Sequence, residues 1–293
     1  MRQVLNLSVV TFQADWGDKE SNLARIADYI NCAARQGSNM VVFPEMSLTG
    51  YDDQPEKPSA ETMQAQLAEP VPGPAAQKVA ELAWKNQPYV LFGMPERVGA
   101  KVYNTLAVCT PEGKSIAYRK LHLALSEPHW AEPGAAPLLF ATPWGPVGCL
   151  ICFDAYSFPE LMRYYAAKGC RLCVNATAFA KSRNAHRART TIEAAVLQND
   201  IFIASANLGG LDHETDFLGG SSIAGPSQKY GEVHYYAGQP FDAPGAFENG
   251  LYTAAIDLSR ASRRIYQRGR DRPADFRPGL YAKLYGELDE ATK

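Results

Sequence analysis

Apolar and polar residues follow one another along this chain in short runs that switch between the period of a strand and that of a helix. Residues 40–43 form an apolar run bounded by polar residues, which is typical of a buried strand. Residues 21–35 instead place Leu23, Ile26 and Ile30 on one side, which predicts an amphipathic helix. The same reasoning predicts strands over 4–13, 89–97, 171–175 and 201–207, two strands within 102–123 joined by a turn at 111–114, two more near Ser221 and Leu251, and helices over 74–86, from the turn after Cys152 to Lys168, and over 186–198.

Strands that alternate with helices place the helices outside the sheets, so the pattern predicts an α/β fold. The chain has 293 residues, without an internal repeat, a low-complexity segment or a clear domain boundary, and α/β folds often reach this length as one domain. Residues 54–73, rich in Pro and Glu, are predicted to form a surface loop. We expect one domain over residues 1–265, followed by an irregular tail over 266–293.

A candidate nucleophile lies at the end of one apolar run. Residues 147–152 end at Cys152, and a polar turn then leads into a helix that starts near Pro159. Open α/β sheets bind their ligands at the carboxyl ends of strands. A helix N-terminus close by also favours the thiolate. The alternative is a structural cysteine, because free cysteines are among the most buried residues.

Two other predicted strands deliver a charged side chain at their ends. The run over 40–43 leads into Pro44 and Glu45, and burial there would raise the pKa of Glu45 into the range useful for proton transfer. Lys120 leaves the second strand within 102–123 near its end. Taken alone, either residue is more simply explained as a solvated surface side chain.

Glu45, Lys120 and Cys152 lie in three stretches that together resemble the carbon–nitrogen hydrolase (nitrilase) superfamily. The stretches read FPEMSLTGY at 43–51, YRKLHL at 118–123 and GCLICFDAYSFPE at 148–160, in the family's order and at its usual separations. The resemblance implies a four-layer α-β-β-α sandwich formed by a single domain. It also implies a homodimer or larger homo-oligomer in which the C-terminal tail contacts the partner subunit.

The resemblance further implies a mechanism that needs neither a metal nor an organic cofactor. Glu45 would take the thiol proton of Cys152, and the sulfur would attack the substrate carbon to form a thioester. Lys120 and the backbone N–H of Phe153 would stabilise the charge of the tetrahedral intermediate. A cationic Lys120 beside the sulfur would lower the pKa of Cys152.

Family members often carry a second glutamate between the lysine and a Pro-Gly pair. Here Glu127 has the better spacing to residues 133–134, and Glu132 is its rival. We assign to Glu127 the role of orienting Lys120 or the substrate. For either glutamate, an exposed loop residue is the ordinary alternative.

The substrate is less well defined than the reaction. Many family members read Cys-Tyr-Asp-x-Arg-Phe-Pro-Glu at the nucleophile, whereas this chain has no arginine and one extra residue before Phe158. By their position after catalytic strands, Tyr51, Phe153, Asn175 and Phe179 are candidate substrate-binding residues. We expect hydrolysis of a small amide with release of ammonia. The alternatives are nitrile hydrolysis and hydrolysis of an N-carbamoyl amino acid or amine.

The cysteine spacing admits a different class of protein, built on a metal or redox site. Cys149-x-x-Cys152 and Cys170-x-x-Cys173 are separated by 17 residues, a spacing that zinc sites also use. Both pairs lie in strand-like runs, however, where residues three apart point to opposite faces and cannot easily share a metal. A Cys–His hydrolase is also conceivable, with His122 at the site, but none of the five histidines lies in a signature with Cys152.

Composition favours an enzyme of a reducing compartment over a binder of polyanions. The 29 basic and 31 acidic residues give a net charge of −2, which provides no electrostatic basis for binding nucleic acid or an anionic membrane. No apolar run approaches the roughly 20 residues of a membrane span. The chain begins with a strand-like alternation rather than a signal peptide. Six cysteines without a secretory signal favour reduced thiols and a cytoplasmic location.

Overall fold

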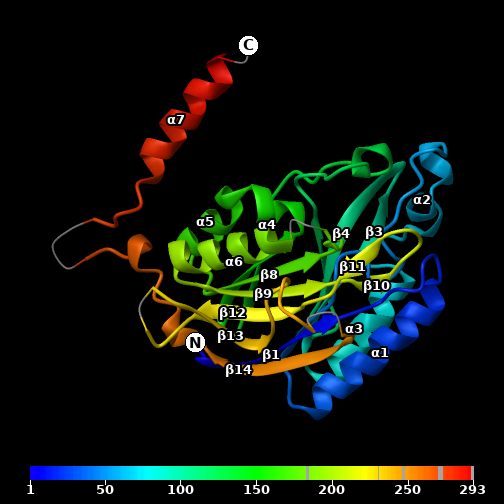
Figure 1. Ribbon diagram of the computed structural model, residues 1–293, viewed down its shortest axis with the longest axis horizontal. Coiled ribbons are helices and arrows are strands. Elements are labelled where there is room, and N and C mark those ends of the chain that lie inside the picture. The colour runs from blue at the N-terminus through cyan, green and yellow to red at the C-terminus, as the bar shows by residue number, and fades with distance from the viewer. Residues whose placement is uncertain (183–184, 230, 246–247, 270–272, 292–293) are drawn as a thin grey trace.

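A computed structural model describes residues 1–182, 185–229, 231–245, 248–269 and 273–291. Two six-stranded mixed sheets pack face to face (Figure 1). In spatial order, the first sheet consists of β14 (Gly250–Asp257), β1 (Val4–Thr11), β2 (Met40–Val42), β3 (Tyr89–Val98), β4 (Lys101–Cys109) and β5 (Ser115–Arg119). The second consists of β13 (Val233–Gly238), β12 (Ser222–Pro226), β9 (Phe202–Asn207), β8 (Leu172–Thr177), β7 (Gly145–Ile151) and β6 (Leu139–Thr142).

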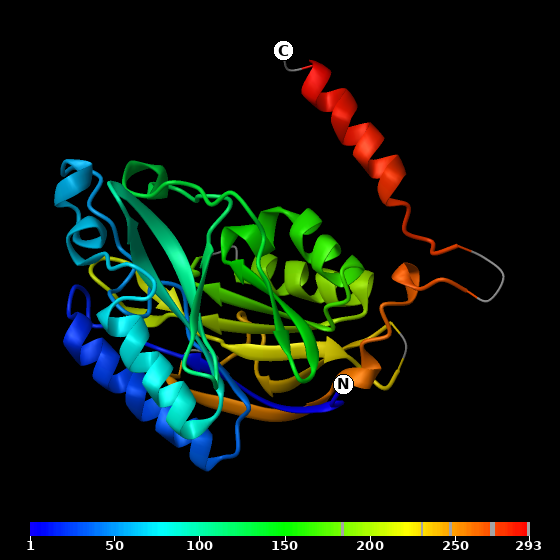
Figure 2. The ribbon, with the colours of Figure 1, turned by 180° about the vertical axis from the view of Figure 1, so that it is seen from behind.

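Helices cover the outer face of each sheet, as the view from behind also shows (Figure 2). The first sheet carries α1 (Lys19–Arg35) and α3 (Pro74–Asn86). Ile26, Ile30 and Ala33 of α1 pack in the apolar layer between these helices and the sheet. The second sheet carries α4 (Phe153–Ser157), α5 (Pro159–Ala167) and α6 (Ala185–Asn199). The predicted α/β fold, a single-domain four-layer sandwich, is therefore confirmed.

The layer between the sheets is the main apolar core, and both sheets contribute to it. Leu7, Val42 and Leu91 extend into it from β1, β2 and β3, and Val174 and Ala204 from β8 and β9. Strands β1–β3 are parallel to one another, as are β7–β9. Since β4 is antiparallel to both β3 and β5, the end of β5 lies at the same edge as the ends of β2 and β3. Glu45 and Lys120 lie at that edge, and Cys152 follows β7 of the second sheet.

Two sequence predictions about regular structure were wrong. The predicted loop over 54–73 contains α2 (Met63–Leu67), whose first three residues are buried. The predicted irregular tail contains α7 (Pro278–Ala291). The sequence patterns also missed β6, β13 and a two-stranded hairpin of β10 (Gly209–Leu211) and β11 (Asp216–Leu218). Among the described residues, no helix is both long and apolar enough to cross a membrane.

Candidate active site

Cys152 occupies a strained turn between β7 and α4. Its backbone has φ +46° and ψ −97°, a conformation that non-glycine residues rarely adopt and that often marks a functional site. Its N–H is held by the neighbouring strand β8, through the Ala176 carbonyl at 2.9 Å and the Asn175 Oδ1 at 3.0 Å. These bonds fix the half-buried thiol at the carboxyl end of β7.

Glu45 lies in a tight turn after β2 that packs directly against β3. The N–H of Gly93 donates to the Pro44 carbonyl at 3.1 Å. A Cβ at Gly93 would lie 2.3 Å from the Met46 nitrogen and 2.5 Å from the Pro44 oxygen, so this contact excludes any side chain. The close approach of the two backbones sets the position of the buried Glu45 carboxylate.

Lys120 joins two carboxylates at this edge. Its Nζ donates to Oε1 of Glu45 and to Oε1 of Glu127, both at 2.8 Å, and all three side chains are buried. Its backbone N–H donates to the Asn104 carbonyl at 2.8 Å, which anchors the residue to β4. Glu132, the rival of Glu127, is exposed and pairs instead with Lys101 at 3.6 Å.

Sequence reasoning missed a fourth member of this cluster. The side chain of Asn104, on β4, donates from Nδ2 to the same two oxygens, Oε1 of Glu45 and Oε1 of Glu127, both at 2.8 Å. An asparagine within a predicted strand was the available signal, because a buried amide requires hydrogen-bond partners. Its partners come from distant parts of the chain, and the residue pattern does not identify them.

The charges within the cluster shift one another's proton affinities. Burial, together with the charge of Glu127, raises the pKa of Glu45 to about 7, although Lys120 opposes the shift. Burial disfavours the charged form of Lys120, but the two carboxylates outweigh it and hold the pKa of Lys120 above the ordinary lysine value. Near neutral pH, Lys120 is therefore cationic, while Glu45 exchanges a proton readily.

Lys120 lowers the pKa of Cys152, as expected, but two other effects outweigh it. Burial and the neighbouring Glu45 carboxylate raise the pKa of the thiol to about 12, and the lowering by Lys120 is smaller. The resting nucleophile is therefore a thiol that needs a base. One buried carboxylate oxygen, Oε2 of Glu45, has no hydrogen-bond partner among the described residues.

Two of the predicted substrate-binding residues, Tyr51 and Asn175, have polar atoms that form hydrogen bonds within the site. Asn175 is fully buried, and its amide binds the backbone of Cys152 and donates to the Tyr156 hydroxyl at 3.2 Å. The half-buried Tyr51 donates its hydroxyl to Oε1 of Glu127 at 3.2 Å. Both side chains therefore contact residues of the predicted catalytic site, and their binding of substrate stays a prediction.

The other two predicted substrate residues, Phe153 and Phe179, are half-buried. Phe153 opens α4, and its ring contacts Phe158 edge-on, with 5.2 Å between ring centroids. The Phe179 ring contacts Tyr156, with 5.3 Å between centroids. Tyr156 stands four residues after Cys152, where the family motif has its arginine, so an aromatic ring replaces a cation at that position.

His122 pairs with a carboxylate other than those of the cluster. Its Nδ1 lies 2.9 Å from Oδ1 of the buried Asp154, and its ring stacks on Phe158. Asp154 also accepts from the Tyr118 hydroxyl at 2.7 Å and the Ile151 N–H at 3.2 Å. Asp154 thus links the end of β5 to the turn that carries Cys152, which explains His122 without a Cys–His dyad.

The cysteine pairs do not converge on a metal site. Cys149 belongs to the core between the sheets, whereas Cys170 and Cys173 belong to the layer beneath α5 and α6. In the described part of the chain, no group of three or more His, Cys, Asp or Glu side chains could hold a metal ion. The zinc hypothesis therefore finds no support in the structure.

A four-layer sandwich with a buried Glu–Lys–Glu cluster beside a strained cysteine defines a hydrolase of carbon–nitrogen bonds. Comparison with known proteins agrees, since a family model described as carbon–nitrogen hydrolase matches residues 6–266. The chain belongs to this family, which confirms the resemblance seen in its motifs.

Sequence relatives and solved structures extend the comparison. Omega-amidase NIT2 of Bos taurus is 31% identical over 257 residues, which cover 83% of this chain and 85% of the relative. The Danio rerio protein of the same name is 31% identical over 253 residues, covering 82% and 84%. An amidase from Nesterenkonia sp. AN1, solved in complex with acrylamide, shares the fold with a TM-score of 0.76 at 21% identity, over 96% of this chain and 97% of that one.

Proposed function

We propose that this protein hydrolyses a small amide through a thioester on Cys152 and releases ammonia. The observation that carries the proposal is the unpartnered Oε2 of Glu45. It belongs to a buried carboxylate whose pKa is about 7. The charges of Glu45 and Lys120 also shift the pKa of the Cys152 thiol, which is protonated at neutral pH. The 31% identity to omega-amidase relatives supports an amide as the substrate.

Glu45 carries the proton in each step of the proposed reaction. Oε2 of Glu45 takes the thiol proton while the sulfur attacks the amide carbon. The charge on the carbonyl oxygen is stabilised by Lys120 and by the N–H of Phe153, which has no partner within its helix because that residue is the first of α4. Glu45 returns the proton to the departing nitrogen, then takes one from the water that attacks the thioester. As the second intermediate breaks its carbon–sulfur bond, Glu45 gives that proton to the departing sulfur, which restores the Cys152 thiol and releases the acid.

Ammonia release from matched small amides, nitriles and N-carbamoyl compounds tests the proposal. We expect the amides to be the best substrates. The rate should fall about tenfold for each pH unit below about 7, because only the ionised form of Glu45 accepts the thiol proton. The high pKa of Cys152 predicts no loss of rate between pH 8 and 10. Faster turnover of nitriles or N-carbamoyl compounds would overturn the choice of substrate, and a flat profile from pH 5 to 8 would contradict Glu45 as the base.

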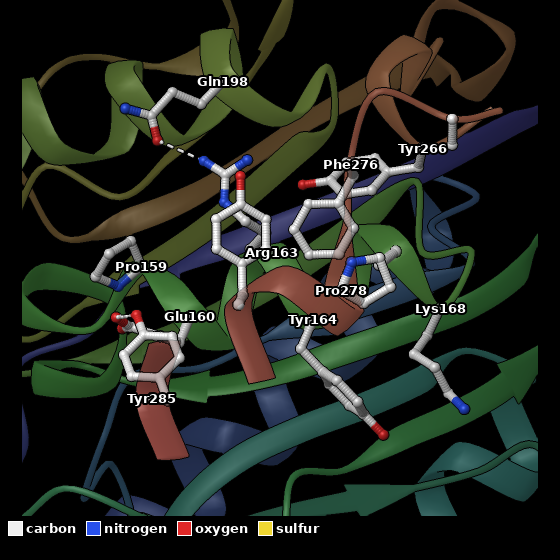
Figure 3. A pocket seen from close by; sticks show the side chains of 13 residues that line it. Pro159, Glu160, Arg163, Tyr164, Lys168, Gln198, Tyr266, Phe276, Pro278 and Tyr285 are labelled. Atoms are coloured by element: carbon white, nitrogen blue, oxygen red, sulfur yellow. Dashed lines mark hydrogen bonds between the residues drawn. The ribbon is translucent and has the colours of Figure 1, made fainter. Parts of the chain in front are cut away.

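We also propose that residues 266–293 form a tail that contacts a second copy of this chain. Helix α7 extends away from the sandwich (Figure 1), and its apolar residues Leu280, Leu284 and Tyr285 are exposed. A cavity of about 850 Å³ lies between the tail and α5 (Figure 3). An exposed apolar helix face beside an apolar cavity favours burial against another protein surface. We therefore expect a homodimer or larger homo-oligomer.

The tail proposal predicts a change of mass in solution when one residue is altered. Leu284→Glu should convert the oligomer to a monomer, as measured by light scattering after size exclusion. Trp84→Glu is the matched control, because Trp84 is an exposed apolar residue of α3, on the outer face of the other sheet. A wild-type monomer, or an oligomer that Leu284→Glu leaves intact, would contradict the proposal.

A reducing compartment, such as the cytoplasm, suits this chemistry. All six cysteines are free, and Cys152 must remain a thiol to attack the substrate. Cell fractionation with detection of the protein tests this placement, and recovery from an oxidising compartment would contradict it.

A further inference from the structure

The four buried side chains next to Cys152 form a closed square of hydrogen bonds. Two donors, Nζ of Lys120 and Nδ2 of Asn104, each bind two acceptors, Oε1 of Glu45 and Oε1 of Glu127, and all four distances are 2.8 Å. Two carboxylates thus share one cation and one neutral amide, which leaves the square with a net charge of −1 when both glutamates are ionised.

The hydrogen bonds of the square leave one carboxylate oxygen without a donor. Each Oε1 accepts from both donors, and that of Glu127 also accepts from the Tyr51 hydroxyl. Oε2 of Glu127 accepts from the Ala124 N–H at 2.7 Å. Of the four carboxylate oxygens, only Oε2 of Glu45 has no donor among the described residues. The arrangement therefore directs basicity to a single atom.

We propose that Asn104 is a positioning residue that holds Glu45 and Glu127 on either side of Lys120 and leaves Oε2 of Glu45 as the one oxygen able to exchange a proton with Cys152. The inference rests on the proposed function, in which Glu45 is the base. It assigns to a neutral side chain the task of setting the orientation and the strength of that base.

A neutral donor at this corner has a specific advantage. A second cation there would stabilise the ionised form of Glu45 further and weaken it as a base, because opposite charges lower a carboxyl pKa. An apolar side chain would leave both Oε1 atoms with one donor fewer and raise that pKa. The titratable groups that interact electrostatically with Glu45 are Lys120, Glu127, Cys152, Tyr51 and Tyr156.

The test uses Asn104→Leu and the rate at which iodoacetamide alkylates Cys152 between pH 5 and 9, followed by mass spectrometry of the Cys152 peptide. Alkylation reports the transfer of the thiol proton without requiring that the enzyme hydrolyse any amide. In the wild type, the rate should rise with a midpoint near 7, where Glu45 loses its proton. In Asn104→Leu we expect the midpoint to move upward by about one pH unit, and alkylation at pH 7 to slow about fivefold, because the ionised fraction of Glu45 falls from about one half to about one eleventh.

Two further variants keep the outcome interpretable. Thr105→Val is the matched control, because Thr105 is the next residue of β4 and bonds to Glu96, away from the square; its midpoint should equal that of the wild type. Asn104→Ser retains one hydroxyl donor and should give an intermediate shift, which provides a reading even if Asn104→Leu fails to fold.

A lower rate with an unchanged midpoint in both Asn104 variants would overturn the inference, since a merely structural role slows alkylation at every pH alike. If the wild type released ammonia from no amide while the midpoint shifted as expected, the proposed substrate would be wrong and the role of Asn104 would stand.

Discussion

Replacing Cys152 by alanine should lower kcat for amide hydrolysis by at least about 10⁴-fold. Nucleophile and base act as a unit, so loss of the nucleophile alone removes nearly all of the rate enhancement that the two produce together. Affinity for the amide should change little, since the substitution removes one sulfur atom and leaves the cluster around Lys120 intact. The measurement is ammonia release at saturating substrate, together with the dissociation constant of a small amide by calorimetry.

Two comparisons make the Cys152 result specific. Cys152→Ser keeps a hydroxyl at the strained turn, and with its much higher pKa it should be almost as inactive as the alanine variant. Cys32→Ala alters another free cysteine, on α1 and outside the cluster, and should retain full activity. Hydrolysis by Cys152→Ala within tenfold of the wild-type rate would exclude Cys152 as the nucleophile.

Lys120→Met should destabilise the protein by about 3–5 kcal/mol at pH 8, because it leaves two buried carboxylates without their cation. Without Lys120, the pKa of Glu45, which burial already raises, must rise further above its unfolded value. A carboxyl whose folded pKa is raised binds protons more tightly in the native state, so stability falls as pH increases through that range. The loss should therefore be smaller at pH 5.5. Denaturant unfolding at both values measures it.

Two controls separate burial from charge pairing in the Lys120 result. Lys101→Met breaks an exposed pair with Glu132 and should cost less than about 1 kcal/mol. Adding Glu127→Gln to Lys120→Met removes one of the two orphaned charges and should restore part of the stability at pH 8. Equal destabilisation at pH 5.5 and pH 8 would show that lost packing, rather than unpaired charge, dominates.

The parts of the site that sequence could predict are those set by local pattern. The apolar runs before Glu45 and up to Cys152, and the alternating pattern before Lys120, placed all three at strand ends, where open α/β sheets bind their ligands. The choice of Glu127 over Glu132 followed from motif spacing, and the structure places Glu127, not Glu132, against Lys120. Their catalytic roles stay predictions until the variants are measured.

The parts that sequence could not predict depend on contacts between distant segments. Asn104 is 59 residues from Glu45 and 23 from Glu127, and no local period links them. Tyr51 and Asn175 were predicted as substrate-binding residues, and only the fold shows that their polar atoms bind other parts of the protein. The pKa of Cys152 depends on burial, which outweighs the nearby cation. Helix α7 was missed because Gly279 and Gly286 interrupt an otherwise apolar period.

The catalytic residues are divided between the two sheets, and this has a consequence for folding kinetics. Glu45, Asn104 and Lys120 belong to the first sheet or leave it at its edge, whereas Cys152 and Asn175 belong to the second. Neither sheet alone carries both the base and the nucleophile. During refolding, catalytic activity therefore cannot return before the sheets have docked, although helical signal can. The lag between the two would time the docking of the two halves of the molecule.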